Sequence, residues 1–271
     1  MKSTHSCRVS YVVLAGLLVC SSVVAASPPD NSITAVSSHE PSKSKADLYT
    51  KGALSAYIKV NGKVILFDTG GKATSLLKNL EELGLDVGAI DAIVLSHSEP
   101  GHVQGLPDLL NAAAMKPKIY VPAAAATAIV QANQDAEVFA VLKPTRVLPD
   151  AWLVGAIELE TKGGTLIEQA LVLDQPDGLV VIVGCSHPEI IEVVQQVKEV
   201  FGHRRIKLVA GGIHLQKTPS DEIREISLKL QQKGVKSLAL SNCTGAPAMK
   251  IFRQEWGDRV VSLDGGDTIE F

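Results

Sequence analysis

The chain has 271 residues, of which 46% are hydrophobic and 4% aromatic, and its formal net charge is −3. A chain of this length and apolar content can bury a complete core, as one large domain or two small ones. The slight excess of acidic residues does not give the positive charge that is typical of nucleic-acid-binding proteins, so we expect no nucleic-acid partner.

The first residues are typical of a targeting segment. Residues 1–26 combine a short basic region, an apolar stretch too short to span a bilayer comfortably and a small-residue cleavage motif before Ser27. They predict a signal peptide and an exported protein, periplasmic or secreted, with no membrane attachment after cleavage. An uncleaved membrane anchor is the alternative, whereas the bulky Val19 before Cys20 disfavours a lipid anchor. The polar composition of residues 27–47 predicts a flexible tether.

From residue 48 onward, segments with helix and strand periodicity alternate. Asn61-Gly62 predicts a two-residue hairpin turn, and Pro176-Asp177-Gly178 predicts a turn between consecutive strands. In the first half of the chain the patterns predict strands at 54–60, 63–70, 91–97 and 118–122, and helices at 73–84, 106–114 and 123–134. Consecutive strands are predicted within 146–161 and 166–187. After these, helices at 188–202, 220–234 and 246–257 alternate with strands at 206–214, 236–245, 259–266 and 268–271. The alternation implies sheets covered by helices, an α/β architecture.

Five polar residues share one position in this pattern, the C-terminal end of an apolar strand: Asp68, His97, His187, His214 and Asn242. Layered α/β folds gather active-site groups there, because rigid strands aim the side chains and the following loops can vary. We therefore expect these residues to share one site.

The two cysteines beyond the leader, Cys185 and Cys243, also follow predicted strands. They could form a disulfide in an exported protein, remain free or bind a metal. We favour two small buried hydrophobic residues over the other interpretations.

The motifs ILFDTG, AIVLSHSEPGHVQGL, GLVVIVGCSHPEI, LVAGGIHL and NCTGAPA occur in this order. Together they resemble the metallo-β-lactamase superfamily, and most closely its branch of dihydropterin-type phosphate synthases and related metallo-hydrolases. The resemblance covers residues 48–271 and implies a four-layer αββα sandwich. It also implies the family's metal motif His-x-His-x-Asp-His, in which the first two histidines hold one metal and the Asp-His pair a second.

This chain departs from that motif at three positions. Glu99 replaces the second histidine, Gly101 replaces the aspartate, and Asn242 replaces the histidine of the branch's His-Cys-Thr-Gly motif. Gly101 offers no side chain, and a carboxamide is a much poorer zinc ligand than imidazole. The resemblance therefore implies one divalent metal, zinc by preference, or none at all.

The resemblance also assigns roles to the remaining polar residues. The predicted metal ligands are His97, Glu99, His102 and His187. His102 could be a fourth ligand or a general acid/base, and Asp68 matches the aspartate that orients a metal-bound histidine. For the substrate, the predicted contacts are His214, Asn242 and Thr244; the loop after Thr244 leads into a helix whose amides could receive an anion.

Three functions remain as hypotheses. The first is an exported mononuclear hydrolase that uses a metal-activated water on an ester, lactone or phosphoester of a small molecule. The second is a non-catalytic binding protein with the same fold. The third, a dihydropterin-type phosphate synthase, ranks last because a signal peptide and an altered ligand motif fit it poorly. The sequence does not indicate an oligomeric state.

Overall fold

The computed structural model describes residues 29–38, 42, 47–50, 53–71, 73–112, 116–132, 136–161, 164–187 and 189–271. The side chains of residues 73, 74, 161 and 242 are not among those described. The predicted signal peptide, residues 1–26, lies outside this range. Within the described ranges, no helix is both long and apolar enough to cross a membrane.

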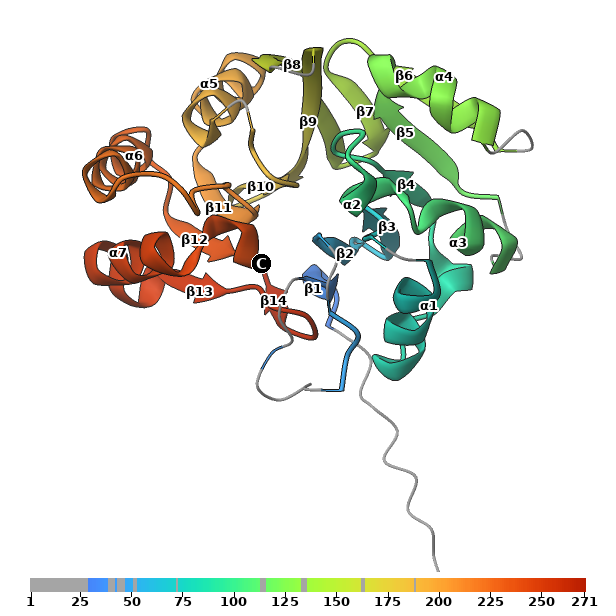
Figure 1. Cartoon of the computed structure of the whole chain (residues 1–271). Coiled ribbons are helices and arrows are strands. Elements are labelled where there is room, and N and C mark those ends of the chain that lie inside the picture. The colour runs from blue at the N-terminus through green and yellow to red at the C-terminus, as the bar shows by residue number, and fades with distance from the viewer. Residues whose placement is uncertain are drawn as a thin grey trace, which may run out of the picture.

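Two seven-stranded sheets form the centre of the molecule (Figure 1). The first sheet has the order β14-β1-β2-β3-β4-β5-β6 and contains β1 (Ser32–Ser37), β2 (Ser55–Val60), β3 (Lys63–Phe67), β4 (Ala92–Val94), β5 (Lys118–Pro122), β6 (Val138–Val141) and β14 (Thr268–Glu270). The second sheet has the order β13-β12-β11-β10-β9-β8-β7 and contains β7 (Thr145–Leu148), β8 (Ala151–Thr161), β9 (Gly164–Gln175), β10 (Gly178–Val183), β11 (Ile206–Gly211), β12 (Ser237–Leu240) and β13 (Val260–Ser262).

Helices cover the outer face of each sheet (Figure 1). The helices are α1 (Ala73–Glu82), α2 (Pro100–Val103), α3 (Leu106–Ala112), α4 (Ala123–Ala132), α5 (Ile190–Phe201), α6 (Ser220–Gln232) and α7 (Ala246–Trp256), with short 3₁₀ turns η1 (Val87–Ala89), η2 (Asn242–Thr244) and η3 (Gly257–Arg259). Apolar side chains of α1, α3 and α4 pack on the first sheet, and those of α5, α6 and α7 pack on the second.

A central core joins the two sheets face to face. Phe67 and Val94 of the first sheet pack in one buried cluster with Leu171 and Val180 of the second. The layers are therefore helix, sheet, sheet and helix, and the predicted αββα sandwich is confirmed.

The predicted hairpin is also present. β2 and β3 pair antiparallel with Val60 opposite Lys63, and both turn residues have positive φ, +48° at Asn61 and +73° at Gly62. Positive φ at both central residues is the conformation that an Asn-Gly pair favours in a two-residue hairpin turn. Two strands and one α-helix were missing from the prediction, namely β1, β6 and α2.

The predicted flexible tether at residues 27–47 is wrong for its central part. Residues 32–37 form β1, which is buried and pairs with β2 on one side and β14 on the other. Its small hydroxyl side chains tolerate burial because they find partners: Thr34 Oγ1 lies 2.9 Å from Thr268 Oγ1, and Ser37 Oγ donates to the Ala53 carbonyl at 2.9 Å. The folded domain therefore begins before residue 48.

Each sheet contains a parallel run, β3-β4-β5-β6 in the first and β10-β11-β12-β13 in the second. Parallel strands end at the same edge of a sheet, so the loops that follow each run gather at one edge. Gly184, directly after β10, lets the two edges approach closely, since a Cβ there would lie 2.2 Å from Ser96 Oγ.

Candidate metal centre

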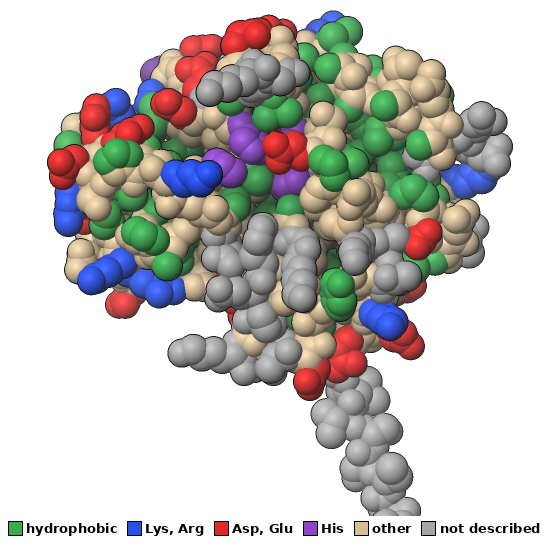
Figure 2. Space-filling model, viewed as in Figure 1, with side chains coloured by type: hydrophobic (Ala, Val, Ile, Leu, Met, Phe, Trp, Pro, Cys, Tyr) green, Lys and Arg blue, Asp and Glu red, His purple; other side chains and the backbone are tan. Residues whose placement is uncertain are grey.

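The polar residues predicted at strand ends come together where these two edges meet. Asp68 follows β3, His97 follows β4, His187 follows β10 and His214 follows β11. The ring centroids of His97 and His187 are 4.9 Å apart, and those of His187 and His214 are 4.8 Å apart. Figure 2 shows histidine side chains gathered around an acidic side chain near the middle of the face.

Asp68 is fully buried and holds His102. Its carboxylate accepts hydrogen bonds from the Ser96 amide at 2.6 Å, the Ser96 hydroxyl at 2.7 Å and His102 Nδ1 at 2.6 Å. Burial by itself would lower the pKa of His102, but the Asp68 carboxylate outweighs it and raises the pKa. Since Nδ1–H is donated to Asp68, the neutral imidazole keeps its lone pair on Nε2.

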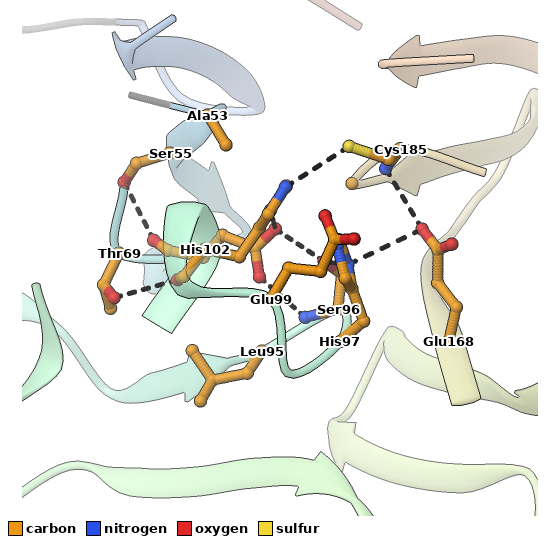
Figure 3. A network of polar contacts seen from close by, with 12 residues as sticks. Ala53, Ser55, Thr69, Leu95, Ser96, His97, Glu99, His102, Glu168 and Cys185 are labelled. Carbon is orange, nitrogen blue, oxygen red and sulfur yellow. Dashed lines mark hydrogen bonds and ion pairs between the residues drawn. The ribbon is translucent and has the colours of Figure 1, made fainter. Parts of the chain in front are cut away.

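Ser96 fixes which nitrogen of the neutral His97 ring carries the proton. Its hydroxyl hydrogen is donated to Asp68, so its oxygen accepts from His97 Nδ1, which lies 2.8 Å away (Figure 3). The lone pair of the neutral His97 imidazole is therefore also on Nε2, which faces the Glu99 carboxylate.

His187 is held in the same way by Glu168, a residue that the sequence analysis missed. Glu168 lies in β9, and its nearly buried carboxylate is 3.2 Å from His187 Nδ1. It also accepts hydrogen bonds from three consecutive amides, those of Cys185 at 3.0 Å and of Ser186 and His187 at 2.9 Å. Burial alone would raise the pKa of Glu168, but the hydrogen bond from His187 and its other donors lower it to about 2.

Only one signal in the sequence could have indicated Glu168. It is a charged residue in an apolar strand pattern, and glutamate is almost never fully buried unless it is paired. The pattern does not say what the partner is.

Glu99 lies between the two free imidazole nitrogens. Its Oε2 atom is 3.4 Å from His97 Nε2 and 3.7 Å from His187 Nε2. The hydrogen bond with His97 is the main reason that the pKa of Glu99 is lowered to about 2. Two neutral imidazole lone pairs and a carboxylate are all acceptors, and a proton on an imidazole or a metal ion would satisfy them together. Two imidazole nitrogens and one carboxylate oxygen are an established zinc donor set, so these residues fit the ion.

The fourth predicted ligand, His102, lies beside this set, and ligand atoms of His97, His102 and Cys185 all lie within 4.8 Å of one another. Its ring centroid is 4.0 Å from that of His97, yet Nε2 points to Cys185 Sγ, 3.3 Å away (Figure 3). Cys185 and Cys243 are both buried free thiols, which agrees with the interpretation favoured from the sequence.

The three residues predicted to contact substrate differ in their surroundings. His214 is exposed beside His187, in a backbone conformation with φ of +43°. Thr244 is fully buried, and its hydroxyl has no hydrogen-bond partner among the described residues. The Asn242 side chain lies outside the described part, although its backbone begins η2. Roles in substrate binding stay predictions for all three.

Comparisons with known proteins agree with this geometry. The chain is similar to the 7,8-dihydropterin-6-methyl-4-(beta-D-ribofuranosyl)-aminobenzene-5'-phosphate synthase of Methanocaldococcus jannaschii. The two are 28% identical over an alignment 270 residues long, which covers 82% of this chain and 91% of that protein. The crystal structure of Tm1679, a metal-dependent hydrolase of the beta-lactamase superfamily, matches with a TM-score of 0.74 and 25% identity, covering 89% of this chain and 98% of that one.

A more distant solved structure shows the fold alone. The metallo-beta-lactamase fold protein YhfI from Bacillus subtilis matches with a TM-score of 0.64 and 14% identity, covering 88% of this chain and 99% of that one. The family model described as the Metallo-beta-lactamase superfamily matches residues 49–193, more than half of the chain. The resemblance inferred from the motifs is thus confirmed, and the chain belongs to the metallo-β-lactamase superfamily.

Proposed function

We propose that this protein is an exported hydrolase that binds one zinc ion through His97, Glu99 and His187. The observation that carries the proposal is the convergence of two imidazole nitrogens on one carboxylate, since Glu99 Oε2 lies 3.4 Å from His97 Nε2 and 3.7 Å from His187 Nε2. Both imidazoles are held from behind through Nδ1, by Ser96 and by Glu168. Such outer hydrogen bonds fix the orientation of a ligand and raise its basicity.

When bound, zinc supplies a water whose pKa falls to about 7. The chain's own residues provide the rest of the site. His102, oriented by Asp68, is a candidate general acid/base next to the zinc ligands. His214, whose ring lies beside that of His187, and Thr244 are the candidate contacts for an ester, lactone or phosphoester. Export follows from residues 1–26, and N-terminal sequencing of the exported protein should give Ser27 as its first residue.

A synthase is the second candidate function, because of the similarity to the M. jannaschii phosphate synthase. Glu99, Gly101 and Asn242 depart from that branch's ligand motif, and we therefore rank the hydrolase first. A non-catalytic binding protein is the alternative in which no metal is bound.

Metal-linked stability of the wild type and of His187→Ala tests the proposal. Zinc at ~100 times its dissociation constant should raise the free energy of unfolding of the wild type by roughly 2.7 kcal/mol, and a chelator should remove this gain. His187→Ala should bind no zinc at this position and should melt at the same temperature with and without chelator. His203, an exposed histidine, provides the control: His203→Ala should respond as the wild type does. Equal melting of the wild type with and without chelator would remove the case for zinc.

A further inference from the structure

Gln169, in β9, joins this strand to the loop that carries His97. Its Nε2 atom donates to the Leu95 carbonyl at 2.7 Å and, at 3.4 Å, to the Tyr120 carbonyl, and its backbone amide donates to the Ser96 carbonyl at 2.9 Å. Leu95 and Ser96 follow β4 and directly precede His97 (Figure 3). The loop is therefore bound to the second sheet at two consecutive carbonyls.

The pleat of β9 explains how one strand reaches both halves of the metal site. Ala170 packs in the cluster that includes α5, α6 and α7, whereas Leu171 packs in the cluster between the two sheets. Successive side chains of a strand point to opposite faces, so Gln169 faces the first sheet as Leu171 does. Glu168 lies on the opposite face, where it accepts the amides of residues 185–187. Two adjacent residues thus bind two different loops.

A β-bulge lies opposite Gln169. The register between β8 and β9 shifts between Val154 and Ile157, so two residues of β8 stand opposite Gln169 alone. A Cβ at Gly155 would lie 2.8 Å from the Gln169 Cβ, so glycine allows β8 to pass this close. Bulges next to active sites re-aim individual residues of a strand. The bulge therefore accompanies the point at which β9 binds the opposite sheet.

Net stability does not explain the Gln169 side chain. It is 1% exposed, and its Oε1 atom has no hydrogen-bond partner among the described residues. A buried acceptor without a partner costs as much free energy as a neutral hydrogen bond contributes, or more. An apolar side chain of similar size would avoid this cost. The benefit of the Nε2 donor is therefore the position that it gives to the loop.

The proposed zinc site requires such positioning. Glu99 Oε2 lies 3.4 Å from His97 Nε2 and 3.7 Å from His187 Nε2. Zinc bonds of about 2.0–2.2 Å place two tetrahedral ligand atoms roughly 3.4 Å apart, and ligand sets must be held to within about 0.5 Å. The two histidines come from different halves of the molecule, so their separation depends on the contacts that join these halves.

We propose that Gln169 is a positioning residue that, together with Glu168, sets the separation of the two zinc-binding imidazoles. Glu168 binds the loop that carries His187. Gln169 binds the loop that carries His97, and it acts through backbone carbonyls and not on the ion itself. The inference rests on the proposed function, because it concerns the separation that one zinc ion requires.

Gln169→Met tests the proposal, because methionine keeps the length and approximate volume of the side chain but donates no hydrogen bond. Gln175→Met is the matched control. Gln175 is also buried in β9 and its Nε2 atom has no partner among the described residues, but it pairs with Gly178, at the end of the strand away from the site. Calorimetry measures zinc affinity, and crystal structures of the metal-free proteins give the separation of the His97 and His187 rings.

We expect Gln169→Met to lower zinc affinity by about 10- to 100-fold, the loss that follows removal of outer hydrogen-bonding partners. The ring centroids of His97 and His187, 4.9 Å apart in the wild type, should change their separation by more than about 0.5 Å. The visible bands of bound Co²⁺, which report coordination geometry, should change as well. Gln175→Met should change none of these quantities.

A second variant keeps the test independent of one substitution. Gln169→Asn retains the amide but is one methylene shorter, so it should no longer reach the Leu95 carbonyl and should give the same changes. Urea denaturation establishes that each variant is folded before its zinc affinity is compared.

The outcomes separate this inference from the proposed function. Unchanged zinc affinity in the Gln169 variants, or a lower affinity with the rings in their wild-type positions, would overturn the role of Gln169 and leave the zinc site intact. A wild type that binds no zinc would overturn the proposed function. A changed ring separation in metal-free Gln169→Met would then still support the positioning role, whereas an unchanged one would overturn that role too.

Discussion

The two halves of the molecule each hold one histidine on one buried carboxylate, but they build this pair differently. Asp68 stands at the end of β3 with φ of +58° and binds side chains and a single amide, whereas Glu168 lies inside β9 and binds three consecutive amides. Asp68 therefore orients His102 and Ser96, while Glu168 fixes the course of the loop that carries Cys185 and His187. One carboxylate positions side chains and the other shapes backbone.

The largest expected effect comes from Glu168→Ala, which removes the acceptor shared by the loop. Buried donors that lose their only partner cost about 1–3 kcal/mol each. With three amides affected, the free energy of unfolding should fall by roughly 3 kcal/mol or more, measured by urea denaturation without added metal.

Glu158→Ala is the matched control, since Glu158 is exposed on the neighbouring strand β8. It should change the free energy of unfolding by no more than about 0.5 kcal/mol. If the two variants lost similar stability, the carboxylate would not be what fixes residues 185–187.

Asp68→Asn should have a smaller effect on stability and a more local one. Asparagine tolerates the left-handed backbone at this position, but its amide group would face donors of Ser96 or His102. We expect a loss of about 2 kcal/mol in the free energy of unfolding. Urea denaturation without added metal measures this loss. Asp258→Asn, at an exposed aspartate of η3, should change the free energy of unfolding by no more than about 0.5 kcal/mol.

This contrast also explains how much could be predicted from the sequence. Asp68 was found because it ends a strand inside a recognisable motif, and the same reasoning placed His97, His187 and His214 at one edge. Glu168 sits in the interior of a strand, where periodicity marks a buried face without naming the loop that will donate to it. Contacts between segments far apart in sequence carry no local signal.

The missed strand β1 has a related cause. Its partner β14 lies at the other end of the chain, and small hydroxyl residues such as Thr34 look like a tether until Thr268 provides a partner. The contact between His102 and Cys185 was missed for the same reason, because the spacing of two motifs does not give the distance between two atoms.

Low pH should reduce the contribution of Glu168 to the free energy of unfolding. That pKa is lowered from 4.5 to about 2, so its contribution to stability is complete above pH 4.5 and is lost as the pH falls towards 2. The difference in unfolding free energy between the wild type and Glu168→Gln should therefore narrow by about 1 kcal/mol between neutral pH and pH 4. Urea denaturation of both proteins at each pH checks this, and a difference that stayed constant would show that Glu168 has an ordinary pKa.

Glu99→Gln should have the smallest effect on stability, although the pKa of Glu99 is lowered to about 2, as that of Glu168 is. The Glu99 side chain is 50% exposed, against 3% for Glu168, so water screens its attraction to His97 and competes for its oxygens. We expect a change below about 1 kcal/mol in the metal-free protein, similar to that of Glu82→Gln at an exposed position of α1. Zinc binding, measured by calorimetry, should in contrast weaken in Glu99→Gln and not in Glu82→Gln, because a carboxamide is the poorer ligand. A large loss of metal-free stability with unchanged zinc affinity would make Glu99 a structural partner of His97 and not a ligand.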